Sequence, residues 1–508
     1  MALRSTRTTD GGTTSSTAPP AKPAETTTTT TAPVPPGISP AGTEDEGAAA
    51  AVHPVDERLP PAKLFTTGLQ HVAAMYAGVI APPLIVGQSA RLSPGELALL
   101  ITASLFTAGI ATLLQTLGFW KIGTRLPFVN GVSFAGVATM TAIVSQHGAN
   151  GRAALPVIYG AVIVGGAFCF LAAPWFCRLL RFFPPVVSGT VITLIGLTLL
   201  PVPMGWIAEN STRGAAPRNV GVALFTLAVV LLGNRLLRGF ARQVALLIGL
   251  VVGTLVAIPF GMVDAGGVQH DAVFALPSPL HFGAPRFDIA AIVSLCIVML
   301  VSMTESTADI LALGEIVDRP ATQDVIARGL RADGLSTALS PFFNGFANSA
   351  FAQNIGLVAI TGIRSRFVVA AGGAILFLAG LFPVIGGLVS LVPEPVLGGA
   401  GIVLFGSVAA SGVRTLLKAD LTDSRNVIVI GVSIGVGVVP IADPTFYDAF
   451  PTWVQTVMGS GISAGCITAV LLNLLFHHLG RTGGPSPAGD PAAETLPLGE
   501  PLGEPQPH

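Results

Sequence analysis

The feature that most constrains this chain is a succession of apolar segments between residues 66 and 478, separated by short loops. Each is close to the roughly 20 residues that cross the hydrocarbon of a bilayer as a helix. Only 10% of all residues are charged, whereas about a quarter would be charged in a soluble protein. We therefore expect an all-α polytopic membrane protein with 14 transmembrane segments, near residues 66–88, 94–116, 127–145, 153–176, 184–204, 218–235, 241–262, 289–315, 329–346, 350–363, 367–390, 394–412, 424–441 and 456–478.

The two ends of the chain differ from the apolar stretch between them. Residues 1–57 are rich in Thr, Pro, Ala and Gly, and residues 481–508 are rich in Pro and Gly. Such composition lacks the bulky apolar side chains that bury a core. We expect disordered tails on either side of a membrane domain at residues 64–479.

The basic residues indicate how the chain crosses the membrane. Fifteen Lys and Arg fall in the loops that follow even-numbered segments or at the edges of those loops, and only five fall in or beside the opposite loops. Because positive charge gathers in cytoplasmic loops, both termini are predicted to be cytoplasmic. The net charge of −1, with no basic block, argues against nucleic acid as a partner.

Short internal matches predict a repeat that relates segments seven apart. Because an odd number of crossings separates the matching segments, the two halves must be inverted relative to each other, as in many transporters. The matches are Pro185-Val186, Gly189 and Gly196 with Pro395-Val396, Gly399 and Gly406, and Ser133-Phe134-Ala135 with Ala350-Phe351-Ala352.

Two segments, 127–145 and 350–363, are short and rich in small or polar residues, which indicates interrupted helices. The second carries the amide pair Gln353 and Asn354 among apolar residues. An amide in hydrocarbon is costly unless it faces a partner, a cavity or a ligand. Secondary transporters often build a substrate site at such an interruption. The alternative is an ordinary polar contact between packed helices.

Few carboxylates fall inside the apolar segments, and three are candidates for chemistry. Glu305 and Asp309 lie four residues apart and so share a helix face, and Asp333 lies in the next segment. Two carboxylates on one face repel each other when both are charged, which favours proton uptake and suits coupling to a proton gradient. The alternative for Asp309 is a brace between neighbouring helices.

A histidine and two phenylalanines in these segments have both a functional and a structural interpretation. His71, in the first segment, could join a polar network or relay a proton, or it could be a structural residue of the interior. Phe134 is placed by the repeat opposite Phe351, and a ring there could stack on a flat ligand. Simple packing in the interior is the alternative for both rings.

Motifs for enzyme chemistry are missing from the sequence. There is no phosphate-binding loop after a strand, no HExxH and no nucleophile elbow. The four cysteines form no CxxC pair and no cluster with histidine at the spacing of metal ligands. We expect neither an enzyme nor a bound metal or cofactor.

Together these residues resemble the nucleobase-ascorbate transporter family, also called the nucleobase cation symporter family. Its signature is Gln, Glu or Pro, then Asn, any residue, Gly, four of any kind, Thr, and Arg, Lys or Gly. The chain satisfies it at Gln353, Asn354, Gly356, Thr361 and Gly362. The resemblance covers residues 64–479 and extends to Gln70-His71, Phe183–Val187 with Gly189-Thr190, Glu305–Leu311, Arg328–Gly334 and Gly399–Gly401.

The resemblance implies a fold and a set of site residues. The fold is two inverted repeats of seven spans, with a core domain (spans 1–4 and 8–11), a gate domain (spans 5–7 and 12–14), short strands in spans 3 and 10, and usually a homodimer. The implied substrate contacts are Glu305, Gln353, Phe134, Ser133, Ala352 and Phe351. Asp333, Asp309, His71 and Asn354 would support coupling or orient the site.

The identity of residue 353 indicates the substrate class. Xanthine and urate carriers of this family have Gln there, whereas similar uracil carriers tend to have Glu. We predict a symporter that imports xanthine and/or urate across a bacterial plasma (inner) membrane, driven by H+ in preference to Na+. The alternatives are a permease for uracil or another nucleobase, and a channel or receptor of the same fold. Sulfate-type carriers share the plan, but Glu305 would repel an anion.

Overall fold

The structure, a computed structural model, describes residues 52–479 apart from 149, 180–181, 210–213 and 264–273. The predicted tails lie outside these residues except for residues 52–57, where the prediction of disorder is wrong. Pro54–Asp56 forms a short 3-10 helix in which Val55 is fully buried. Asp56 pairs with Arg319 and Arg366, so burial and charge together order this segment.

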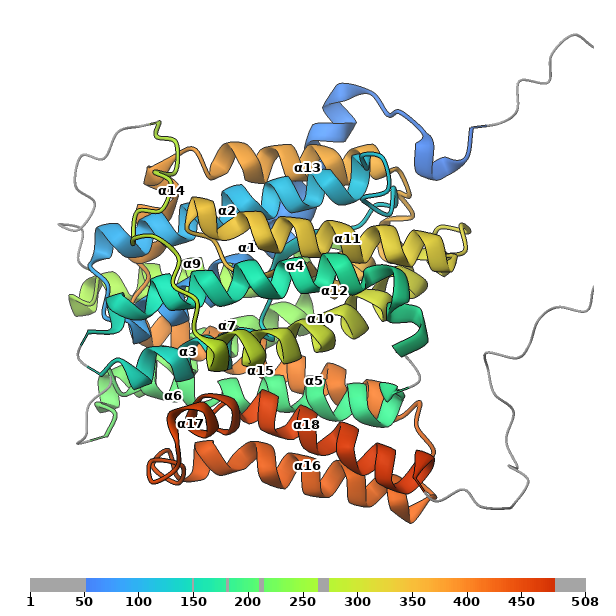
Figure 1. Ribbon diagram of the computed structural model, residues 1–508. Coiled ribbons are helices and arrows are strands. Elements are labelled where there is room, and N and C mark those ends of the chain that lie inside the picture. The colour runs from blue at the N-terminus through green and yellow to red at the C-terminus, as the bar shows by residue number, and fades with distance from the viewer. Residues whose placement is uncertain (1–51, 149, 180–181, 210–213, 264–273, 480–508) are drawn as a thin grey trace, which may run out of the picture. The chain divides into compact units, whose positions relative to one another are not determined.

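Almost all of the described chain is helical (Figure 1), with two three-residue strands, β1 (Asn130–Val132) and β2 (Asn348–Ala350). The helices before residue 260 are α1 (Pro61–Ser89), α2 (Pro94–Leu117), α3 (Val137–Gln146), α4 (Leu155–Leu179), α5 (Pro185–Leu199), α6 (Pro201–Ile207), α7 (Pro217–Leu236), α8 (Phe240–Gln243) and α9 (Ala245–Ala257). Those after it are α10 (Ile289–Ile316), α11 (Gln323–Leu339), α12 (Ala352–Thr361), α13 (Arg366–Ala379), α14 (Pro383–Ser390), α15 (Glu394–Leu416), α16 (Ser424–Ala442), α17 (Thr452–Met458) and α18 (Gly461–Asn473).

Nine of the described helices, or helices joined end to end, are long and apolar enough to cross a membrane. A tenth crossing is obtained if α13 and α14, bent by 87° at their junction, form one broken span. The other four predicted segments contain α3, α9, α11 and α12, each of 17 residues or fewer. The described chain is therefore a mostly helical membrane protein with about nine or ten apolar crossing helices.

The start signals of the helices explain one boundary that differs from the sequence prediction. The segment expected at 329–346 is α11, which begins six residues earlier, at Gln323. The Thr322 side chain accepts a hydrogen bond from the Val325 N–H, which caps the helix there. Its C-terminal end precedes Pro341, which lies in a short 3-10 helix before β2.

The strands pair in antiparallel fashion where the two interrupted segments meet. Asn130 pairs with Ala350, Gly131 with Ser349 and Val132 with Asn348. A threonine holds each strand in the same way. Thr112 Oγ1 of α2 donates to the carbonyl of Asn130 and accepts from its N–H, and Thr337 Oγ1 of α11 does the same at Asn348.

The helices pack in two groups. In the first, α2 packs on α13, α4 on α11, α1 on α13 and α10 on α4, with both strands between them. In the second, α5 packs on α15, α7 on α9 and α16 on α18. Glycines permit the closest crossings of the first group, since a β-carbon on Gly109 would lie 2.4 Å from Phe377 N and one on Gly334 would lie 2.4 Å from Phe170 N.

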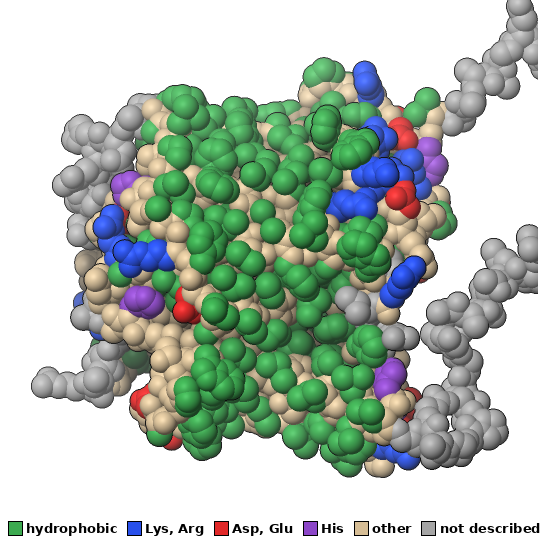
Figure 2. Space-filling view, in the orientation of Figure 1, with side chains coloured by type: hydrophobic (Ala, Val, Ile, Leu, Met, Phe, Trp, Pro, Cys, Tyr) green, Lys and Arg blue, Asp and Glu red, His purple; other side chains and the backbone are tan. Residues whose placement is uncertain are grey.

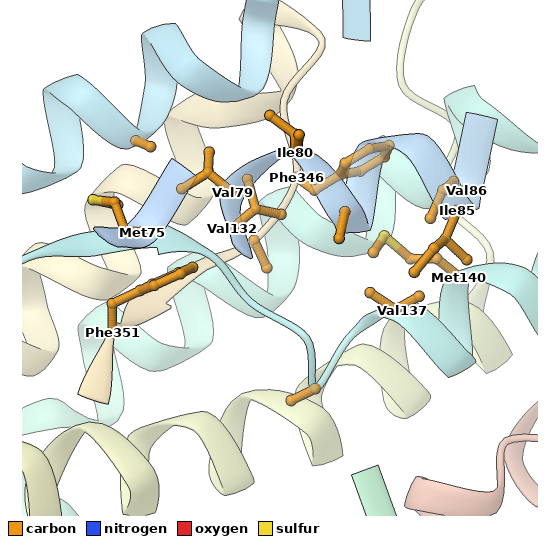
Figure 3. Close-up of a cluster of buried hydrophobic side chains, with 14 of the residues drawn as sticks. Met75, Val79, Ile80, Ile85, Val86, Val132, Val137, Met140, Phe346 and Phe351 are labelled. Carbon is orange, nitrogen blue, oxygen red and sulfur yellow. The ribbon is translucent and has the colours of Figure 1, made fainter. Parts of the chain in front are cut away.

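The apolar interior of the first group surrounds the strands (Figure 3). Met75 and Val79 of α1 lie beside Val132 of β1 and the Phe351 ring, and all four side chains are nearly inaccessible. On the outside, Figure 2 shows hydrophobic side chains over much of the visible face, as expected for helices in contact with lipid.

Candidate functional site

The two interrupted segments place the starts of two half-helices at opposite ends of the strand pair. β1 leads into α3 and β2 leads directly into α12, which begins at Ala352. The first N–H groups of a helix have no partner within it, and the helix dipole adds positive potential there. The pairing of the strands therefore fixes where both short helices start, and the start of α12 is open to polar ligands.

A cavity of about 80 Å³ lies at this junction. Residues of the first helix group form one wall, namely Val132, Phe134, Ala135, Glu305, Ser349, Ala350, Phe351, Ala352 and Gln353. The second group forms the other wall with Ile192 and Ile195 of α5 and Ser407, Val408 and Ser411 of α15. The cavity is therefore mixed in character, with a carboxyl and an amide among apolar and hydroxyl groups.

The structure brings five of the six expected substrate contacts to this cavity: Glu305, Gln353, Phe134, Ala352 and Phe351. Glu305, on α10, is partly buried and makes no hydrogen bond or ion pair within the described part of the chain. Gln353, on the first turn of α12, is exposed and is open to a ligand on the cavity side. Their free acceptor and donor groups can bind a polar heterocycle.

The two phenylalanine rings have different environments. Phe134 is partly buried at the cavity wall, with its ring 6.0 Å from that of Phe405 in an edge-on arrangement. The Phe351 ring instead lies between Gly78 and Gly131, where β-carbons would come within 2.6 Å and 2.5 Å of it. The Phe134 ring is thus available for stacking, whereas the Phe351 ring packs in the apolar interior.

The strand contacts correct the alignment of the two interrupted segments by one residue. The matching threonine hydrogen bonds relate Asn130 to Asn348, so Phe134 corresponds to Ala352 and not to Phe351.

The sixth expected contact, Ser133, is buried, with its hydroxyl 3.3 Å from that of Ser302.

Asn354 points away from its neighbour Gln353. Its Nδ2 lies 3.0 Å from His71 Nδ1 and donates to the His71 carbonyl at 3.2 Å. Both side chains are about 1% exposed, and His71 Nε2 has no hydrogen-bond partner among the described residues. This contact ties α12 to α1 behind the cavity.

Asp333 is the centre of a second buried network. Its Oδ1 accepts from Gln115 Nε2 at 2.7 Å and from Asn130 Nδ2 at 2.5 Å, and Ser306 also donates to this carboxyl. The network connects α11 to α2, to β1 and, through Ser306, to the helix of Glu305. Asp309, one turn beyond Glu305, has a buried Oδ2 with no hydrogen-bond partner among the described residues.

Residues 62–446 match a family model named Xan_ur_permease and described as "Permease family". Uric acid permease PucJ of Bacillus subtilis (strain 168) is 41% identical over 82% of this chain and 92% of its own length. The chain belongs to the nucleobase-ascorbate transporter family. This confirms the resemblance seen in the sequence, and it makes the protein a permease and not an enzyme.

Other relatives in the family are similar over the same region. Uric acid transporter UacT of Escherichia coli (strain K12) is 40% identical over 83% of this chain and 88% of its own length. Xanthine permease of Bacillus subtilis (strain 168) is 38% identical over 82% of this chain and 94% of its own length. The transmembrane domain of the cyanobacterial bicarbonate transporter BicA has the same fold, with a TM-score of 0.56 at 14% identity over 83% of this chain and 99% of that one.

The sequence analysis missed two groups of residues around the permease site. Gln115 and Asn130 supply donors to Asp333, and the only sequence signal for them is an amide within an apolar segment. Ile192, Ser407 and Ser411 complete the cavity from the second helix group. Small and apolar residues of this kind are common in membrane helices, so the sequence carried no signal for them.

Proposed function

We propose that the protein is a proton-coupled symporter that imports oxidised purines, xanthine and/or urate, across the plasma membrane. The observation that carries the proposal is the shared cavity of Glu305 and Gln353, beside the Phe134 ring and the start of α12. Relatives named as uric acid and xanthine permeases support the substrate class.

Recognition follows from complementary hydrogen bonding. An oxidised purine presents alternating C=O and N–H groups along its edge. The Gln353 amide offers both a donor and an acceptor, and the Glu305 carboxylate accepts from ring N–H groups. The Phe134 ring covers a face of the heterocycle. A base that leaves these groups unpaired is rejected, because buried polar groups without partners cost more than lost apolar contact.

Coupling is assigned to the carboxyl groups and the histidine around the site. Glu305 and Asp309 share a face of α10, and their carboxylates repel each other when both are charged. A proton bound to one of them removes this repulsion and so favours the state in which substrate is bound. Asp333 holds α11 and β1 in place through Gln115 and Asn130. H+ is the proposed ion and Na+ the second choice, since the amides beside Asp333 already occupy its Oδ1.

The proposed architecture has 14 crossings in two inverted repeats of seven. The four interrupted or short segments complete the count, and equivalent helix pairs support the repeat. If spans seven apart are equivalent, the contact of α2 with α13 is equivalent to the contact of α11 with α4. In the same way, the contact of α7 with α9 is equivalent to that of α16 with α18. We assign the first helix group to a core domain (spans 1–4 and 8–11) and the second to a gate domain (spans 5–7 and 12–14).

Transport is proposed to occur by movement of the core domain against the gate domain. Among the described residues, side-chain hydrogen bonds join three residue pairs across the two groups, and all three lie toward the end of the bundle opposite the C-terminal end of α2. They connect Gln88 to Trp206, Thr139 to Ser460, and Gln146 to Thr456. With both termini cytoplasmic in a bacterial inner membrane, these contacts close the outer side. A homodimer is the proposed assembly.

Uptake in membrane vesicles tests the proposal. Labelled urate and xanthine should enter saturably, faster with acid outside than with a sodium gradient, and uracil should compete weakly. Glu305→Ala should abolish binding, and Glu305→Gln should retain part of the binding but lose acceleration by the proton gradient. Full uptake by either variant would remove Glu305 from the site, and unsaturable flux would indicate a channel.

The Gln353→Glu variant tests the substrate class separately. A carboxylate offers acceptors only, so the C=O group of the purine loses its donor and urate affinity should fall. Competition by unlabelled xanthine, urate and uracil measures the change in preference. An unchanged competition profile would show that the amide does not select the substrate.

A further inference from the structure

The turn that follows α2 has an unusual conformation with an exposed tip. Phe119 and Ile122 exchange two backbone hydrogen bonds of 2.9 Å, which leaves Trp120 and Lys121 at the tip. Trp120 has φ 50° and Arg125 has φ 57°, in a region that side chains other than glycine adopt at a cost. The turn is held by a hydrogen bond from the Arg125 N–H to the Gln115 carbonyl at 2.9 Å.

An apolar groove of about 320 Å³ lies directly beside this turn, between α2 and α13. It is lined by Ile110, Leu113, Leu114 and Leu117 of α2, Gly118 and Phe119 of the turn, and Phe377 of α13. From Ile110 to Leu117 the groove follows the helix for about 10 Å, at 1.5 Å per residue. Its lining and length suit part of an acyl chain.

The groove ends at Arg125, and Lys121 lies on the adjacent turn with its Nζ 5.9 Å from the centre of the Trp120 ring. A β-carbon on Gly118 would lie 2.8 Å from Arg125 Cγ, so the stem of Arg125 lies against the mouth of the groove. Among the described residues, Lys121, Arg125 and Arg331 form no ion pair. Figure 2 shows Lys and Arg side chains gathered at the end of the molecule where α2 ends and α11 begins.

Asp318, Asp324 and Asp56 at this end form ion pairs, whereas Glu57 and Glu315 form none among the described residues. Nine Lys and Arg (Arg58, Lys63, Lys121, Arg125, Arg319, Arg328, Arg331, Arg364 and Arg366) face these five acidic residues. Asp324 pairs with Arg328 on the same helix, and Asp56 pairs with Arg366. The local excess of charge is therefore positive. Phe119 and Trp120 are 70% and 76% exposed, which is typical of aromatic side chains at the level of lipid head groups.

We propose that the groove and the adjacent cations form a binding site for an anionic phospholipid, with one acyl chain along α2 and the phosphate at Lys121 and Arg125. Basic pockets between membrane helices bind anionic head groups in this way. A lipid with a zwitterionic head group offers the same acyl chain, but its own cationic group neutralises the phosphate charge, so it should bind the two cations more weakly. Soluble phosphate offers the charge without the chain, so the site selects for both together.

Lipid titration of the purified full-length protein tests the proposal, with native mass spectrometry as the readout. Phosphatidylglycerol should bind more tightly than phosphatidylcholine. The double variant Lys121→Gln/Arg125→Gln should bind phosphatidylglycerol about 30-fold more weakly, equivalent to about 2 kcal/mol. The matched control, Arg235→Gln/Arg238→Gln, removes two exposed cations from the end of α7 and should leave the affinity unchanged.

A second variant tests the groove itself. Leu114→Trp fills the groove and should weaken binding of both lipids while the lipid-free melting temperature and urate uptake stay near the parent values. Unchanged phosphatidylglycerol affinity in the cation variant would overturn the proposal. It would also be overturned if millimolar inorganic phosphate raised the melting temperature as much as the lipid does, because the site would then be one for free phosphate.

Discussion

The Phe351 ring provides the sharpest prediction, because the structure encloses it from two sides. A β-carbon on Gly131 of β1 would lie 2.5 Å from Cε2 of the ring and 3.0 Å from Val79 Cγ2. On the other side, one on Gly78 of α1 would lie 2.6 Å from Cε1. Gly131→Ala therefore forces the ring or the strand to move, and glycine backbone or Val79 blocks the ring on both sides.

The magnitude follows from the cost of inserting a methyl group into a packed interior. Overpacking of this kind costs about 1–3 kcal/mol, or roughly 5- to 150-fold in the folding equilibrium. Because Ser349, Ala350 and Phe351 also line the cavity, displacement of β2 should lower substrate uptake as well as stability. We expect both a lower melting temperature in detergent and a lower initial rate of labelled urate uptake.

Two further variants make the test specific. Phe351→Leu in the Gly131→Ala background should recover part of the lost stability, since the smaller side chain vacates the space that the methyl group needs. Gly431→Ala on α16 is the matched control, because nothing lies within 4 Å of the added β-carbon. It should leave stability unchanged or raise it by up to about 1 kcal/mol. Wild-type stability in Gly131→Ala, or no rescue by Phe351→Leu, would refute the reasoning.

Two buried amides give further predictions. Asn130→Ala removes one of the donors to Asp333 and should lower stability by about 1.5–3 kcal/mol, measured as a fall in melting temperature. Asn348→Ala is its control: both amide atoms of Asn348 lack side-chain partners among the described residues, so a similar loss would contradict the role given to the Asp333 contact. Asn354→Ala separates α12 from His71 and should cost about 0.5–1.5 kcal/mol and slow urate uptake, and unchanged uptake would show that the contact has no part in transport.

Much of the fold was predictable because it depends on local composition. Nine of the predicted segments correspond to helices that are apolar enough to cross the membrane. The interrupted segments at 127–145 and 350–363 were predicted from small and polar residues. The first contains β1 and all but the last residue of α3, and the second contains α12, but β2 begins two residues before the predicted boundary. The start of α11 was missed because its first turns carry Gln323, Asp324 and Arg328, which are too polar for the apolar run by which the segment was recognised.

The chemical part of the site was also predictable in outline. Glu305 and Gln353 were identified because a carboxyl or amide in hydrocarbon needs a partner or a ligand. What the sequence could not distinguish was the direction of neighbouring side chains. Gln353 faces the cavity and Asn354 faces His71, because successive residues of a helix point about 100° apart.

The sequence by itself determined that this chain is a membrane protein and which of its segments are interrupted. It also determined which polar residues need a partner or a ligand, because an unpaired polar group is costly anywhere in hydrocarbon. Only the tertiary structure decided which of those residues share a cavity. The wall formed by Ile192 and Ser407 comes from helices far from Glu305 in the chain, and the same cavity brings together Phe134 and Ala352, which are also far apart in the sequence. Contacts between distant segments depend on packing of the whole bundle, which no local pattern of residues records.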